Sequence, residues 1–79
     1  MSTRPGVRLL LTADQALVLF DWMSREDGRN AIPTEHPAEQ KVLWEIEGQL
    51  ERILPEPLRA NYAEAVANAR QRVIAGEGA

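Results

Sequence analysis

The stretch "ALVLFDWM", residues 16–23, decides how this chain folds. Seven of its eight side chains are apolar, and Asp21 is its only charge. At about 100° per residue, a helix would sort these side chains into faces. The face expected to point into the core holds Ala16, Leu19, Phe20 and Met23. Val18 and Trp22 lie roughly opposite, so we expect either a central helix or a helix whose second face contacts another protein.

Start and stop signals flank this stretch. The Thr12 hydroxyl can cap a helix, while the side chain of Gln15, three residues later, reaches back to the N–H of the cap. Gly28 can supply a left-handed residue that terminates the helix. The sequence therefore predicts a first helix over residues 13–27.

A second helix is predicted over residues 37–54. Pro37 suits its first position, where the missing N–H is not needed, and Pro55 and Pro57 end it. Trp44 points away from the apolar face of this helix. The apolar face, which we expect in the core, holds Val42, Leu43, Ile46, Leu50, Ile53 and Leu54.

A third helix is predicted over residues 62–75. Asn61 and Glu64 have the spacing of a capping pair, and Gly76 follows as a terminator. A start near Pro57 is the alternative. The lighter apolar stripe of this helix, also expected in the core, holds Tyr62, Ala65, Val66, Ala69 and Val73.

The segment "VRLLL" is short and apolar and lies between Pro5-Gly6 and the first helix, which predicts a β-strand. A lone strand cannot satisfy its own backbone N–H and C=O groups, and the chain offers only "RNAIPT" as a weak second strand. We therefore expect the segment to pair with itself across a two-fold dimer, or with the sheet edge of a partner. An extended arm packed on the helices is the alternative. The residues expected to pair are Val7, Arg8, Leu9, Leu10 and Leu11.

Size and composition predict one small, mostly α-helical domain over residues 1–79, with a flexible lead-in at 1–6 and a frayed tail at 76–79. A chain this short buries only about 60% of the surface of its unfolded form. It has no cysteine, which excludes disulfides and thiolate zinc sites. Helix packing and oligomerisation remain as sources of stability, and we expect a homodimer.

Charge and hydropathy limit the classes of partner. The net charge is −3, from twelve acidic and nine basic residues. Nucleic-acid binders, in contrast, usually cluster Lys and Arg. No apolar run approaches the length of a membrane span, and the N-terminus does not resemble a signal peptide. We expect a cytoplasmic protein that binds neither nucleic acid nor membrane.

The sequence contains no recognisable catalytic, cofactor or metal motif. His36, beside Glu35 and Glu39, is the only histidine, and its position at a predicted helix start explains its polarity. The glycines are isolated, so no phosphate-binding loop is present. We expect a non-enzymatic protein without cofactor or metal.

The two tryptophans lie off the predicted core faces. Trp and Tyr are enriched in the buried centres of protein–protein interfaces. Gly48, one helical turn after Trp44, leaves a gap beside its ring. The residues expected to bind a protein partner, whose identity the sequence does not give, are Val18, Trp22, Lys41, Trp44 and Gly48.

A strand followed by two helices is also the order of ribbon-helix-helix DNA-binding proteins, whose paired strands enter the major groove. Leucines stand here where groove-reading polar residues would be, and the charge is acidic. A dimeric DNA-binding regulator is therefore the alternative function.

The stretches "LLLTADQALVLFDWMSRED" and "HPAEQKVLWEIEGQLERIL" together resemble short bacterial proteins of uncharacterised function. The resemblance covers about two thirds of the chain and carries no catalytic motif. In general character, such small acidic proteins resemble antitoxins and immunity proteins. The resemblance implies an accessory or neutralising partner of a larger protein.

Overall fold

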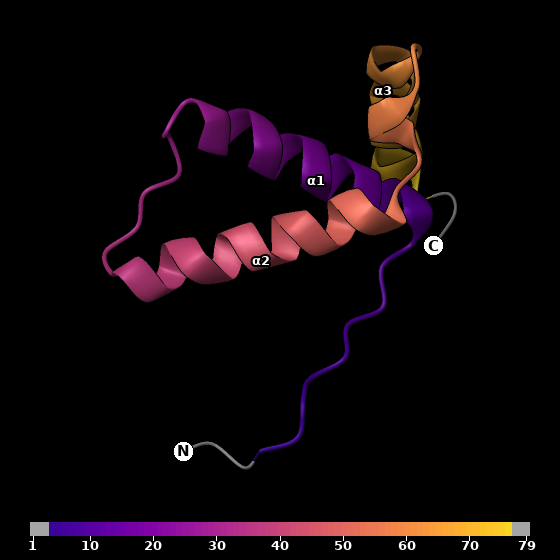
Figure 1. Ribbon diagram of the computed structural model, residues 1–79. Coiled ribbons are helices and arrows are strands. Elements are labelled where there is room, and N and C mark those ends of the chain that lie inside the picture. Colours follow the sequence, from indigo (N-terminus) through magenta and orange to yellow (C-terminus); the bar gives the residue numbers. More distant parts are fainter. Residues whose placement is uncertain (1–3, 77–79) are drawn as a thin grey trace.

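Residues 4–76 are described by a computed structural model, and they form three α-helices. α1 (Ala13–Gly28) and α2 (Pro37–Ile53) lie side by side as an antiparallel pair, as Figure 1 shows. A single 3₁₀ turn, η1 (Glu56–Leu58), leads to α3 (Tyr62–Ala75), which crosses α1 near its start. The mostly helical fold is confirmed. The outer parts of the predicted lead-in and tail, residues 1–3 and 77–79, lie outside the described residues.

The start of α1 is the predicted capping box. The Gln15 N–H donates to the Thr12 hydroxyl at 3.1 Å, and the Thr12 N–H donates to the Gln15 side chain at 2.9 Å. The predicted terminator is wrong. Gly28 is the last residue of the helix, and the left-handed residue is Asn30, at φ 55°. Asparagine is one of the few residues that visits this region readily.

The start of α2 uses His36 as its cap. The Nδ1 atom of His36 accepts the N–H of Ala38 at 3.0 Å, and the Glu39 carboxylate accepts the N–H of His36 at 3.3 Å. Pro37 occupies the first turn, as predicted. α2 ends at Ile53, one residue before the predicted end and ahead of the two prolines.

α3 has the predicted bounds and ends at Gly76, whose φ of 80° is left-handed. Its start differs from the prediction because the side chain of Asn61 makes no capping hydrogen bond. The alternative start near Pro57 corresponds only to η1.

α1 is the central helix, because it packs against both α2 and α3. This is the first of the two possibilities raised by "ALVLFDWM". Leu17, which is not in the predicted core stripe of α1, is 3% exposed and belongs to the core. The buried core comprises Leu17, Phe20 and Met23 of α1, Leu50 of α2, Leu54 just after the end of α2, and Val66 and Ala69 of α3.

The predicted core face of α2 is only half right. Leu50 and Leu54 are buried and Leu43 packs against them, but Ile53 is 75% exposed, and Val42 and Ile46 are exposed as well. The apolar stripe of α2 is broader than the surface that α1 presents to it. Its outer half is therefore left uncovered.

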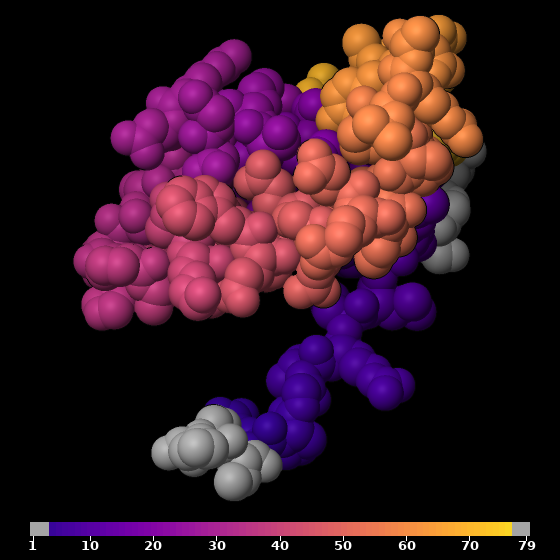
Figure 2. Space-filling view, viewed as in Figure 1, coloured from indigo at the N-terminus to yellow at the C-terminus, as the bar shows by residue number. Residues whose placement is uncertain are grey.

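The strand predicted over Val7–Leu11 is not formed, and residues 4–76 contain no strand. The segment finds no second strand in the chain with which to exchange backbone hydrogen bonds. Residues 4–11, which we call the arm, instead run away from the helices as an irregular segment, visible in Figure 2 as a projection from the helical body.

Candidate functional site

An apolar groove lies between the arm and the outer side of α2. Its volume is about 480 Å³. Gln49 is the only polar side chain among the residues that line it. The lining residues are Val7, Leu9 and Leu11 of the arm and Ile46, Gln49, Leu50 and Ile53 of α2.

The arm has two sides. Val7, Leu9 and Leu11 line the groove, as expected for alternate residues of an extended chain. Leu10 does not line it and is 95% exposed, and Val7 and Leu9, although they line it, are themselves 90% and 80% exposed. The arm therefore presents apolar side chains both to the groove and to solvent.

The molecule exposes more surface than its mass predicts. Folded monomers of 8.8 kDa have an accessible surface of about 4,800 Å², whereas this chain has 6445 Å². Counting residues 1–3 and 77–79 at the area of an unfolded chain still leaves an excess of about 1,000 Å². The radius of gyration, 14.2 Å, likewise exceeds the roughly 11.6 Å of a compact chain of this length.

Trp44 is 58% exposed but fixed in orientation. Its indole N–H donates to Oδ2 of Asp27 at 3.0 Å, and the side-chain amide of Gln40 donates to Oδ1 of the same carboxylate at 3.0 Å. The end of α1 thus holds the ring against α2. Nothing in the sequence pattern pointed to Asp27, because the two helices carry these groups 17 residues apart.

The space at Gly48 lies next to the Arg52 guanidinium, and no side-chain atom of Trp44 comes within 4 Å of the position that a Cβ atom would take. A Cβ atom placed on Gly48 would meet only the Arg52 guanidinium, at an ordinary contact distance of 3.5 Å. Lys41, one turn before Trp44, is exposed. Lys41, Trp44, Gly48 and Arg52 follow one another at helical spacing, and we call this side of α2 the Trp44 surface.

Glu47 borders the Trp44 surface with an unsatisfied carboxylate. Its Oε1 atom is buried without a hydrogen-bond partner. Burial, and then the nearby carboxylates of Asp27 and Glu51, raise the pKa of Glu47 above its usual range. Residues 4–76 contain no group of three His, Asp or Glu side chains arranged to hold a metal ion.

The structure separates the five residues predicted to bind a partner. Val18 packs partly against the core, and Trp22 is 46% exposed on α1. Lys41, Trp44 and Gly48 share one side of α2. The exposed Val42, Ile46 and Ile53 were missed as surface residues. The breadth of the apolar stripe on α2 was the available signal, since one neighbouring helix covers only part of it.

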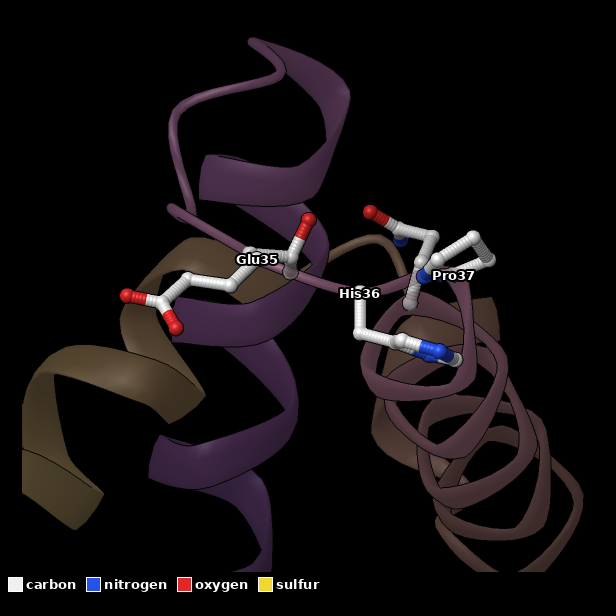
Figure 3. A pocket seen from close by; sticks show the side chains of 5 residues that line it. Glu35, His36 and Pro37 are labelled. Carbon is white, nitrogen blue, oxygen red and sulfur yellow. The ribbon is translucent and has the colours of Figure 1, made fainter.

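A shallow hollow of about 320 Å³ lies at the start of α2. Figure 3 shows Glu35, His36 and Pro37 around it. The Nδ1 atom of His36 is occupied as the helix cap, and the Glu39 carboxylate accepts the N–H groups of Glu35 and His36. The groups at this end of α2 are therefore used by the helix itself.

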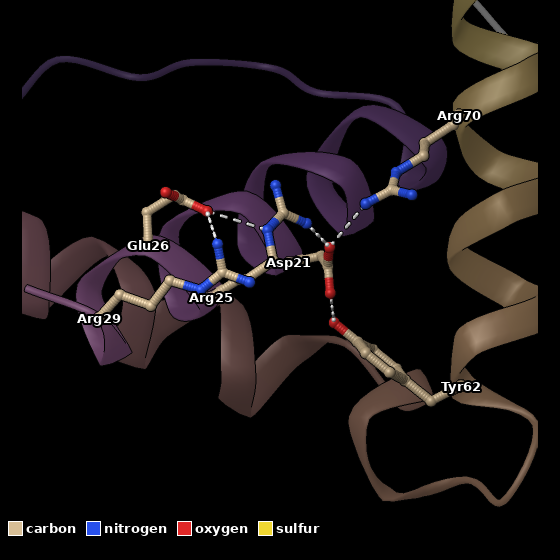
Figure 4. A network of polar contacts seen from close by, with 6 residues as sticks. All are labelled: Asp21, Arg25, Glu26, Arg29, Tyr62 and Arg70. Atoms are coloured by element: carbon tan, nitrogen blue, oxygen red, sulfur yellow. Dashed lines mark hydrogen bonds and ion pairs between the residues drawn. The ribbon is translucent and has the colours of Figure 1, made fainter. Parts of the chain in front are cut away.

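A network of polar contacts joins α1 to α3, as Figure 4 shows. Asp21 accepts hydrogen bonds from the Tyr62 hydroxyl at 2.8 Å, from Arg70 at 3.1 Å and from Arg25 at 2.7 Å. Burial, and then the bond to Asp21, raise the pKa of Tyr62 to about 12. The network is exposed only at its arginines, and its contacts fix the position of α3.

A second contact between α1 and α3 lies nearer the start of α1. The Arg72 guanidinium donates to both oxygens of Asp14, at 2.8 and 2.9 Å. These hydrogen bonds are the main reason that the pKa of Asp14 is lowered. Like the Asp21 network, this contact joins residues far apart in the sequence and was not predicted.

None of the helices within residues 4–76 combines the length and apolar character needed to cross a membrane. No protein-family model, curated protein or solved structure matches the chain.

Proposed function

We propose that this protein is a non-enzymatic interaction module that associates with itself and with a larger protein. The observation that carries the proposal is the excess accessible surface, about 1,000 Å² or more above that of a compact monomer. Much of the exposed surface is apolar, on the arm and on the outer side of α2. Apolar patches of several hundred Å² mark contact sites in soluble proteins.

The larger partner binds at the Trp44 surface. An exposed tryptophan held by a hydrogen bond loses little side-chain freedom when it becomes buried, which favours binding. Lys41 and Arg52 give the ring a charged border, and the gap at Gly48 can accept a partner side chain. A central aromatic ring with a polar rim is the usual anatomy of a binding hot spot.

The module acts as an accessory or neutralising protein of the antitoxin or immunity type. Its small size and net charge of −3 support this role, because an acidic surface attracts a basic partner and speeds association. Separate surfaces for self-association and for the partner allow both contacts at once.

The proposal is tested by capturing partners from the native host on the immobilised protein. Trp44→Ala should keep its free energy of unfolding within about 1 kcal/mol. Its affinity for the captured protein should fall by about 30-fold or more, the value for a hot-spot residue. Ile74→Ala, which removes an exposed apolar side chain from α3, is the matched control and should bind as the wild type does.

Two results would contradict the proposal. One is a Trp44→Ala variant that unfolds readily but shows no separate loss of binding, which would make the ring a structural group. The other is tight binding to DNA that weakens steeply with salt, which would favour the ribbon-helix-helix alternative. Sedimentation equilibrium tests the self-association, and we expect twice the chain mass of 8.8 kDa.

A further inference from the structure

We infer that the groove is the binding site for the arm of a second copy of this chain, so that two copies exchange arms reciprocally. The inference rests on the self-association proposed above and names its mode. The arm of each copy would lie between the arm and α2 of the other. In the single chain, this space is the groove of about 480 Å³.

The arm and the groove match in chemistry. The groove is lined by apolar side chains from both the arm and α2, with Gln49 as the one exception. The arm carries four apolar side chains in five consecutive residues, Val7–Leu11. An arm that enters the groove also lies beside the arm of its host. The two extended segments can then exchange the backbone hydrogen bonds for which the single chain has no second strand.

The arm and α2 also carry complementary, opposite charges. The arm contains Arg4 and Arg8 and no acidic residue. α2 contains four glutamates against Lys41 and Arg52. A basic, apolar segment is therefore brought to an acidic, apolar helix, an arrangement that steers association and fixes orientation.

The exposed area is large enough for a second copy to cover, and the direction of the arm favours that copy over closure of the arm onto its own α2. A stable interface removes about 800 Å² from each partner. The excess surface of this chain, about 1,000 Å² after the ends are set aside, reaches that value. Thr12, which joins the arm to α1, is held by the capping box, and the arm leaves α1 directed away from the helices (Figure 1).

Engineered cysteines test the exchange, because the chain has none of its own. Leu9→Cys places a thiol on the arm, and Ile46→Cys places one across the groove on α2. The two single variants are mixed under mild oxidation, with a tag on the Ile46→Cys chain so that mixed dimers differ in mass from Leu9→Cys homodimers. Ile74→Cys, exposed on α3, replaces Ile46→Cys in the matched control.

Arm exchange predicts a disulfide-linked mixed dimer with Ile46→Cys. At about 10 μM protein it should form about 100-fold faster than with Ile74→Cys, because thiols held in one complex meet at millimolar effective concentration. Circular dichroism on each variant checks that the helices persist.

Two outcomes would overturn the exchange. In the first, the mixed dimer forms no faster with Ile46→Cys than with Ile74→Cys. In the second, the double variant Leu9→Cys/Ile46→Cys oxidises wholly within single chains while the mixed single variants stay unlinked, which would show that the arm closes on its own α2. Partner capture that still depends on Trp44 would in either case leave the proposed function standing. Only the inference that the groove binds the arm of a second copy would be rejected.

Discussion

α1 packs against two neighbouring helices, and the two contacts differ in how completely the apolar side chains beside them are covered. On the α3 side, Asp14 and Asp21 accept directed hydrogen bonds from Tyr62, Arg70 and Arg72, above a core that buries Ala69 completely. On the α2 side, Asp27 accepts two hydrogen bonds from Gln40 and Trp44 at the end of α1. There, however, about half of the apolar stripe of α2 remains uncovered.

This difference separates the α1–α3 junction, which fixes the fold, from the outer side of α2 and the arm, which are available for binding. Domains of this size are only marginally stable. Apolar side chains that stay in contact with water add nothing to the free energy of unfolding of the single chain. The α1–α3 junction has its polar groups satisfied. The outer side of α2 and the arm have apolar groups that another molecule can cover.

The largest effect is expected where the two sides meet. Phe20 lies in the core at 6% exposure, on the helix that both neighbours share. Phe20→Ala should lower the free energy of unfolding by about 3–5 kcal/mol, which would nearly abolish folding of so small a domain. Urea denaturation followed by circular dichroism measures this change. A variant that kept most of its stability would show that α1 is not the common core helix.

The last residue of α2 and the residue that caps it lie on opposite sides of the boundary between core and uncovered surface. Leu54 is 7% exposed and Ile53 is 75% exposed. Leu54→Ala should cost about 2–5 kcal/mol, whereas Ile53→Ala should change the stability of the monomer by less than about 0.5 kcal/mol. Denaturation at a concentration low enough to give monomers tests both, and sedimentation tests the weaker self-association expected of Ile53→Ala. Equal losses of stability would mean that the outer side of α2 is covered within the chain.

The helices were predictable because their ends are local events. The capping box of Thr12 and Gln15, the proline at the start of α2 and the left-handed Gly76 each depend on residues within one turn. Such signals can be recognised from a few neighbouring residues of the sequence. The prediction at Gly28 failed because Asn30, two residues later, took the left-handed conformation instead.

The contacts between helices were not predictable in the same way. Leu17 lies outside the predicted core stripe of α1 but is buried in a core to which all three helices contribute, and the hydrogen bond between Asp21 and Tyr62 spans 41 residues. Periodicity shows that α2 has a broad apolar stripe, but the helix that it meets decides which half is buried. For the same reason, the strand predicted over Val7–Leu11 is not formed in the single chain, since a strand needs a partner that residues 4–76 do not supply.

A smaller effect is expected from the polar junction on the α3 side. Tyr62→Phe removes the hydroxyl that donates to Asp21 and should cost about 0.5–1.5 kcal/mol at neutral pH. The pKa of Tyr62 is about 12 in the folded protein, against an ordinary value of 10.0. Between these values the unfolded chain loses its proton first. The stability that the hydroxyl contributes is therefore fully present below pH 10 and lost as the pH rises towards 12.

The difference in stability between wild type and Tyr62→Phe should accordingly shrink across that window. Tyr62 is the only tyrosine, so the near-ultraviolet absorbance of tyrosinate reports its titration directly. A midpoint near 10 in the folded protein would mean that the hydroxyl is neither buried nor held by Asp21, and that Arg70 and Arg72 alone supply the polar contacts of α3 with α1.

The smallest effect is expected beside the Trp44 surface, where a carboxylate oxygen of α2 has no hydrogen-bond partner. Glu47 has a raised pKa from burial and from the carboxylates of Asp27 and Glu51, and one of its oxygens has no partner. A raised pKa means that its contribution to stability is present at low pH and lost as the pH rises through the folded value. Glu47→Gln should therefore raise the stability by up to about 0.5 kcal/mol at neutral pH and change little in acid, where the glutamate is protonated.

Glu45→Gln is the matched control, since it removes the same charge from an exposed position of α2 without touching the buried oxygen. Thermal denaturation of both variants at neutral and acidic pH separates the two effects. A gain confined to Glu47→Gln at neutral pH would show that the surroundings of Trp44 are poorly compensated in the free protein, unlike the α1–α3 junction. A partner that supplies a donor or a cation there would remove that deficit on binding. A loss of stability in Glu47→Gln would instead mean that its carboxylate makes a necessary contact and that both sides of α1 are equally satisfied.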